Sequence, residues 1–170
     1  MKVLFVDDGS RDRTLQLLEA ACSGDDRLAV LSLSRNFGHQ TAVSAGLMHS
    51  DGDVTVVIDA DLQDPLAVIP EMLSKWSEGH DVVYGIRCKR KESITLRLAY
   101  AVFYRILKRV ANIDIPLDAG DFCLMDRQVV GWINTMPEHN RFVRGLRGWV
   151  GFSQTGLPYE RQARRAGKTK

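Results

Sequence analysis

Short apolar runs alternate along the first half of the chain with segments whose apolar residues recur every three or four positions. The apolar runs are rich in β-forming residues and predict four strands, at 2–6, 28–34, 53–59 and 81–85. The periodic segments predict three helices, at 10–22, 39–50 and 65–79. Strands that alternate with helices favour an α/β domain with a mostly parallel sheet covered on both faces.

Two local signals indicate where helices begin. Ser10 precedes the first helical segment and is expected to be its N-cap. Asp64 and Pro65 predict the start of the third helix, with Asp64 as the cap and Pro65 at the first position. Pro70 is then expected within an early turn, where the missing N–H does little harm.

The composition is that of one globular domain with a core. The chain has 170 residues, of which 45% are apolar and 26% charged. Three scattered cysteines, Cys22, Cys88 and Cys123, are too few for a disulfide framework or a zinc site and fit a reducing compartment. No stretch approaches the roughly 18 apolar residues of a membrane-spanning helix, and no signal peptide is visible.

Charge is divided unevenly between the two halves. Residues 1–86 contain 14 acidic and 6 basic side chains, whereas residues 87–170 contain 7 acidic and 17 basic ones. A basic half predicts an anionic partner, although an uneven solvated surface would give the same count.

Carboxylates follow two of the predicted strands directly. Asp7 and Asp8 end the first strand, and Asp59 and Asp61 end the third. The carboxyl ends of parallel strands share one edge of the sheet, where ligands bind. Carboxylates crowded there raise each other's pKa unless a cation joins them, and oxygen ligands suit Mg²⁺. Gln63 lies two residues beyond Asp61 and points the same way in an extended segment, so the pattern predicts a divalent metal site.

Simpler interpretations exist for each motif taken alone. An Asp-Asp-Gly sequence is often a turn with a helix cap, and Asp-x-Asp is common by chance. A phospho-accepting receiver domain would need one buried aspartate and a later lysine, which the cluster around residues 59–63 does not resemble. The chain has no glycine-rich phosphate loop, which disfavours a Rossmann dehydrogenase and implies that a bound nucleotide is held through metal and carboxylates.

The chain resembles the family-2 glycosyltransferases of the GT-A fold in four segments, VDDGSRDRT, LSRNFGHQTAVSAGL, DGDVTVVIDADLQDP and DVVYGIR. Within that family it is similar to the polyprenyl-phosphate sugar transferases, the group of dolichol-phosphate mannose synthases and bactoprenol glucosyl transferases. The similarity continues through DAGDFCLMDRQVV, MPEHNRFVRGLRGWVGF and YERQARRAGKTK, so it covers the whole chain in order.

The resemblance implies an inverting, metal-dependent transfer of a sugar from a nucleotide diphosphate to a polyprenyl (undecaprenyl or dolichyl) phosphate. Asp8 would contact the nucleobase and Asp59 the ribose or diphosphate. Mg²⁺ or Mn²⁺ would be held by Asp59, Asp61 and Gln63. The donor pocket would be lined by Gly38, His39 and Gln40, although helix capping is an equal reading of His39 and Gln40.

Asp121 matches the acid that serves such enzymes as a base or as an acceptor-positioning group, with Asp118 a second candidate and a loop cap the plain alternative. Because a phosphate acceptor is already anionic near neutral pH, Asp121 is expected to orient more than to abstract. The resemblance assigns the donor and lipid phosphates to Arg141, Arg144, Arg161, Arg164 and Lys170.

Residues 94–111 predict an amphipathic helix with basic residues on one side and apolar residues on the other. Such a helix could pack its apolar face on the core or lie on an anionic membrane. The lipid acceptor that the resemblance implies favours the membrane surface, and the expected location is its cytoplasmic face.

One departure from the family pattern shapes the expectations. The family's first strand, with a Pro-x-Tyr-Asn-Glu-like segment, is lacking, so residues 1–170 are expected to form a single GT-A catalytic domain without that strand, as a piece of a longer membrane-associated chain.

The expected partners are a nucleotide sugar, a polyprenyl phosphate and a membrane surface but no nucleic acid, and a homo-oligomer stays open. The alternatives are an inactive nucleotide- or membrane-binding module and a transferase with a polysaccharide acceptor, which the absence of a Gln-x-x-Arg-Trp motif disfavours.

Overall fold

The computed structural model describes residues 1–88 and 119–162. The elements in this part of the chain are, in order, β1 (Val3–Asp7), α1 (Thr14–Gly24), β2 (Leu28–Ser32), α2 (His39–Met48), β3 (Val54–Val57), the 3₁₀ turn η1 (Leu66–Val68), α3 (Ile69–Ser77), β4 (Val82–Cys88), β5 (Ala119–Asp126), α5 (Arg127–Thr135), α6 (Val143–Trp149) and β6 (Gln154–Glu160). Each strand and helix predicted before residue 88 is present within a few residues of its expected ends.

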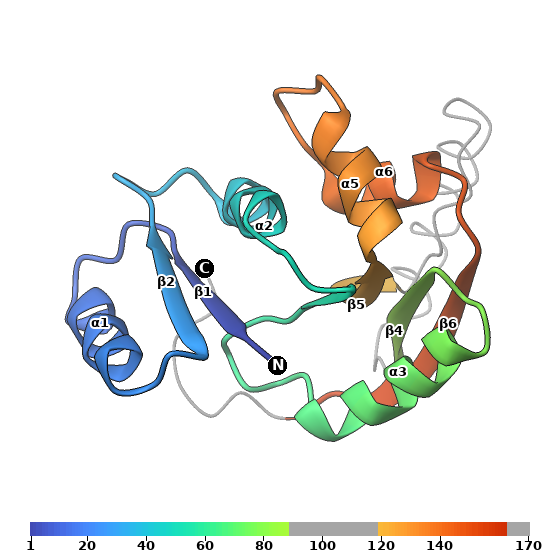
Figure 1. The fold of residues 1–170 in the computed structure, drawn as a ribbon, viewed down its shortest axis with the longest axis horizontal. Coiled ribbons are helices and arrows are strands. Elements are labelled where there is room, and N and C mark those ends of the chain that lie inside the picture. Colours follow the sequence, from blue (N-terminus) through green and yellow to red (C-terminus); the bar gives the residue numbers. More distant parts are fainter. Residues whose placement is uncertain (89–118, 163–170) are drawn as a thin grey trace, which may run out of the picture.

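The described strands form two sheets rather than one (Figure 1). β1 and β2 pair in parallel, and the second sheet has the order β3-β5-β4-β6. β4 and β6 are parallel, but β5 runs antiparallel to both of its neighbours. The sheet predicted as mostly parallel is therefore mixed at β5, a strand that the sequence did not predict, and β1 and β3 are not hydrogen-bonded to each other among the described strands. Two parallel strands must be joined by a right-handed crossover, usually through a helix, whereas antiparallel strands need none. β5 is antiparallel to its neighbours and therefore does not have to continue the alternation of strands and helices that precedes it.

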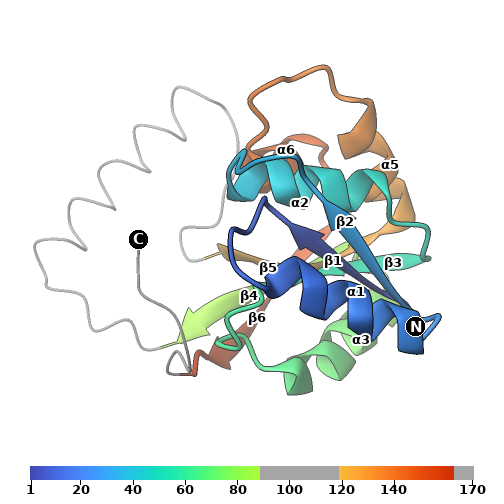
Figure 2. The same cartoon turned by 90° about the vertical axis from the view of Figure 1, so that its left-hand side faces the viewer.

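Helices cover both faces of the larger sheet, as predicted (Figure 2). α3 lies on one face and α5 and α6 lie on the other, while α1 and α2 flank the β1–β2 pair. Alternate residues of β5 point to opposite sides: Phe122 and Leu124 pack in a cluster with Met72 of α3. Cys123 and Met125 pack in a second cluster with α2, α5 and α6. β5 is thus the central strand of the core.

Both helix-start predictions need correction. α1 begins at Thr14 rather than after Ser10, because the backbone N–H of Ser10 is held by the Asp7 carboxylate in a turn. Asp64 precedes η1 but makes no cap, because its side chain is buried and accepts a hydrogen bond from Tyr159. Pro70 lies in the first turn of α3, as expected.

Gly9 lies at a close backbone contact that predicts a large stability effect. Its φ is +68°, and a Cβ there would lie 2.4 Å from the carbonyl carbon of Arg35. Gly9→Ala combines a left-handed backbone with a clash against main chain, so it should lower the free energy of unfolding by about 2–4 kcal/mol in urea titrations. Gly131→Ala is the control, because Gly131 lies inside α5 with nothing near its missing Cβ. This control should stabilise the protein by about 0.5–1 kcal/mol, and equal effects of the two variants would contradict the contact at Gly9.

Candidate active site

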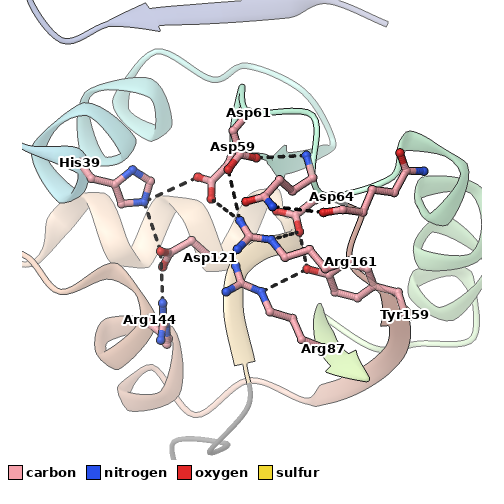
Figure 3. Close-up of polar contacts among 11 residues, drawn as sticks. His39, Asp59, Asp61, Asp64, Arg87, Asp121, Arg144, Tyr159 and Arg161 are labelled. Atoms are coloured by element: carbon pink, nitrogen blue, oxygen red, sulfur yellow. Dashed lines mark hydrogen bonds and ion pairs between the residues drawn. The ribbon is translucent and has the colours of Figure 1, made fainter. Parts of the chain in front are cut away.

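One loop after β3 supplies most of the acidic side chains of the site (Figure 3). β3 ends at Val57, and the loop from Asp59 to Asp64 leads to η1. The loop turns sharply at Leu62, whose φ is +57°, and the Asp61 carboxylate accepts a hydrogen bond from the Gln63 N–H at 3.1 Å. This local turn brings the carboxylates of one short segment toward a common centre.

Arg161, the residue after β6, lies among the carboxylates of this loop and forms ion pairs with them. Its Nη2 lies 3.7 Å from Asp59 Oδ2 and 3.4 Å from Asp61 Oδ2. Its Nε lies 3.4 Å from Asp64 Oδ1. Burial, and then the neighbouring carboxylates, raise the pKa of Asp59 above the ordinary value, despite the opposing charge of His39. The loop therefore concentrates negative charge around a single guanidinium.

The donor set fits a divalent cation in its chemistry. Three carboxylates gather around one positive charge, and oxygen ligands are those that Mg²⁺ and Mn²⁺ prefer. Within residues 1–88 and 119–162, however, no three acidic, histidine or cysteine side chains form a ready-made metal cluster. Gln63 directs its Nε2 to the carbonyl oxygen of Gln162 at 3.1 Å. Asp59, Asp61 and Gln63 therefore stay a predicted ligand set.

Asp121 lies at the same edge because β5 is antiparallel, so the beginning of this strand meets the end of β3. One oxygen, Oδ2, is 3.2 Å from His39 Nε2 and 3.2 Å from Arg144 Nη2. Burial alone would raise the pKa of Asp121, but the His39 hydrogen bond and the charge of Arg144 hold it well below its usual range. A carboxylate this acidic stays ionised and is a weak base, which agrees with a positioning role.

His39 is the titratable partner in this contact. The hydrogen bond to Asp121 raises the pKa of the His39 imidazole above 6.5, and Asp59 Oδ1 lies 3.9 Å from the same nitrogen. Because the folded-state pKa is raised, the stabilisation from this pair is present below about pH 6.5 and is lost as the pH rises through the raised value.

An NMR titration of the histidine ring signals in EDTA should therefore show His39 titrating above 6.5. Asp121→Asn should return the His39 pKa toward its ordinary value. An unshifted His39 in both proteins would rule out the contact.

Asp8 and Gln40 are engaged with the protein backbone. The two oxygens of Asp8 accept from the N–H groups of Phe37 at 2.7 Å and Gly38 at 3.0 Å. Gln40 Oε1 accepts from the N–H of Val143 at 2.9 Å. Asp8 thus fixes the loop before α2, whose Gly38 has a φ of +97°, and Gln40 ties α2 to α6. Their assignment to the donor pocket stays a prediction.

The predicted phosphate-binding cations are found in different settings. Arg144 and Arg161 reach the site, whereas Arg141 donates to the carbonyl oxygens of Ile133 and Met136 at the end of α5. The remaining predicted features, Arg164, Lys170, Asp118 and the helix at 94–111, lie outside the described residues.

A buried polar chain beside the site was missed by the sequence reasoning. The Tyr159 hydroxyl donates to Asp64, and Arg87 Nε donates to that hydroxyl at 3.4 Å. Burial, and then Asp64, raise the pKa of Tyr159 to about 12. Gly85 makes room for the ring, since a Cβ there would lie 2.6 Å from Tyr159. Arg87 could have been found by extending the fourth strand to residue 88, where strand-end side chains are candidates.

Comparison with known proteins identifies the family of the chain. The sequence model of glycosyl transferase family 2 matches residues 1–131. The chain belongs to glycosyl transferase family 2. It is 50% identical over 170 residues to an uncharacterized glycosyltransferase, YkcC, of Bacillus subtilis (strain 168), covering 99% of this chain and 53% of that protein. It is 40% identical over 171 residues to the prophage bactoprenol glucosyl transferase homolog of Escherichia coli (strain K12), covering 100% of this chain and 56% of that protein.

The solved structures support the fold. The crystal structure of glucosyl-3-phosphoglycerate synthase from Mycobacterium tuberculosis matches with a TM-score of 0.57 and 22% identity, over 98% of this chain and 62% of that one. The predictions of a family-2 glycosyltransferase and of its α/β GT-A fold are confirmed. The chain spans about half the length of the curated relatives it matches.

Proposed function

We propose that residues 1–170 are the catalytic domain of a transferase that moves a sugar from a nucleoside-diphosphate donor to a polyprenyl phosphate. The observation that carries this proposal is the meeting of two groups at one sheet edge: the carboxylates of the Asp59–Asp64 loop, and Asp121 with its cations His39 and Arg144. Relatives named bactoprenol glucosyl transferases, in Escherichia coli and in Shigella phage SfV at 39% identity, support the lipid acceptor.

The chemistry is a displacement at the anomeric carbon. An oxygen of the acceptor phosphate forms a bond to that carbon, and the bond to the donor diphosphate breaks with its electron pair leaving on the diphosphate. Attack from the opposite face would invert the configuration. Mg²⁺ or Mn²⁺, when bound, would neutralise charge on the diphosphate, and the Asp59–Asp64 loop would hold it. Arg144 and protonated His39 lie where they could receive the acceptor phosphate, and Asp121 keeps both in position.

Membrane association follows from the lipid acceptor and has one supporting feature in the fold. Trp132 of α5 and Trp149 of α6 each expose 62% of their surface, next to the half-exposed Phe142. Exposed tryptophans suit the boundary between water and lipid, because the ring is apolar and its N–H is polar. Within the described ranges, no helix has the length and apolarity to cross a bilayer. We infer that this domain works at the cytoplasmic face of a membrane.

A transfer assay tests the proposal. The purified chain is incubated with UDP- and GDP-sugars, Mn²⁺ and a short-chain polyprenyl phosphate in detergent, and lipids are analysed by mass spectrometry. The expected product is a polyprenyl phosphate heavier by one sugar residue, formed only with metal, and its anomeric configuration read by NMR tests inversion. Polyprenol without the phosphate is the matched control and should stay unmodified. Transfer to an oligosaccharide, or nucleotide binding without a product, would instead favour a polysaccharide acceptor or an inactive binding module.

A further inference from the structure

Arg161 makes unusually long contacts for a guanidinium among carboxylates. Its three ion pairs measure 3.4–3.7 Å. The surface pair between Arg27 Nη2 and Asp25 Oδ2 measures 2.7 Å, the length of an ordinary charge-assisted hydrogen bond. Arg161 therefore balances the charge of the loop mainly through long contacts, and its contact with Asp61 is a hydrogen bond near the upper limit of length. Small divalent cations bind oxygen ligands at much shorter distances, roughly 2.0–2.1 Å for Mg²⁺.

Asp64 provides an independent sign of unused binding capacity. Its side chain is fully buried, and its Oδ2 has no hydrogen-bond partner within the described part of the protein. The facing Arg161 Nε is also buried without a hydrogen bond there. Buried charged groups normally satisfy their hydrogen bonds, because an unsatisfied group loses the full solvation that water gave it. This pair is thus poorly solvated where the loop converges.

The segment that carries Arg161 is fastened to the acidic loop by its neighbour. The N–H of Gln162 donates to the carbonyl oxygen of Gln63 at 2.9 Å, and Gln63 Nε2 donates to the carbonyl oxygen of Gln162 at 3.1 Å. These two bonds keep the backbone at residue 162 beside the loop. The long side chain of Arg161, which is 28% exposed, can leave the carboxylates while its backbone stays in place.

We propose that Arg161 is a resident counter-cation that competes with a divalent metal for the carboxylates of Asp59, Asp61 and Asp64. Metal entry displaces the guanidinium, which is then free to bind the phosphates of the donor. The residue would thus set the metal affinity of the site and make it low until a phosphate ligand is present to receive the arginine. This inference rests on the proposed function only for the identity of that phosphate ligand.

The test measures Mn²⁺ affinity of the whole chain without nucleotide, from the EPR signal of free Mn²⁺. Arg161→Gln should bind Mn²⁺ about tenfold more tightly than the wild type, because a positive charge beside the ligands is gone. Arg161→Lys keeps the charge and should stay close to the wild type. Arg127→Gln removes the same charge at an exposed pair with Asp53 and should change nothing. Circular dichroism and thermal unfolding verify that each variant is folded.

Each outcome decides the inference separately from the proposed function. Equal or weaker Mn²⁺ binding by Arg161→Gln, or equal tightening by Arg127→Gln, overturns the competition even if the chain transfers sugar to lipid. Tighter Mn²⁺ binding by Arg161→Gln, without tighter binding by Arg161→Lys, supports the competition even if the chain transfers no sugar. Addition of a nucleoside diphosphate should then tighten Mn²⁺ binding more in the wild type than in Arg161→Gln, because only the wild type offers the released guanidinium.

Discussion

Asp121→Asn is expected to lower the kcat of sugar transfer by about 10²–10³-fold, because it removes the charge that holds His39 and Arg144 at the proposed acceptor side of the site. The amide has nearly the same shape but can no longer pair with two cations. The Kd for the nucleotide sugar, measured by calorimetry, should change by less than about threefold, since the interaction belongs to the reacting geometry rather than to ground-state binding.

Asp126→Asn is the matched control for this prediction. Asp126 lies at the opposite end of the same strand, where it caps α5 through the N–H of Gln128 and accepts from Trp76. Asparagine also caps helices well, so kcat should stay within about twofold of the wild type. If the kcat of Asp121→Asn were as high as that of Asp126→Asn, Asp121 would have no role in the catalytic site.

Asp61→Asn is expected to weaken Mn²⁺ binding by about 10–100-fold and to lower transfer by about 10³-fold at limiting metal, because a ligand charge is lost. Mn²⁺ affinity is measured by EPR and transfer by lipid mass spectrometry. Raising the Mn²⁺ concentration should restore part of the activity, which a folding defect would not permit.

Asp53→Asn removes an exposed carboxylate just before β3 and is the control for Asp61→Asn. Its partner is the exposed Arg127, at 2.9 Å. Mn²⁺ affinity and transfer should both match the wild type in this variant. Unchanged Mn²⁺ binding in Asp61→Asn would show that the acidic loop is not the metal site.

The first half of the fold could be predicted because its signals are local. Apolar runs and helical spacing follow directly from which face of each element is buried, so the elements before residue 88 were expected. β5 and β6 were not. The apolar run of β5 covers only four residues, 122–125, and lies between Asp121 and Asp126, so it is too short to stand out. β6 contains Gly156 and Pro158, which are unfavourable in strands.

The site could be predicted only in part, since its partners are far apart in sequence. The strand-end rule singled out Asp59 and Asp61, and the family resemblance singled out Asp121 and Arg161. Asp64 was expected to cap a helix because its neighbour is a proline, but its partner Tyr159 is 95 residues away. No local pattern reveals such a pairing.

The order β3-β5-β4-β6 has a consequence for the synthesis of the chain. β3 and β4 both hydrogen-bond to β5 and not to each other, so neither has that neighbour until Asp126 has left the ribosome. Until then the nascent chain carries apolar strands with open edges, which are sites of aggregation. Folding of this sheet must wait for contacts distant in sequence, which makes it slow. Truncation before residue 126 should therefore yield insoluble protein in expression tests, and β4 keeps one open edge until β6, which ends at Glu160, has also been made.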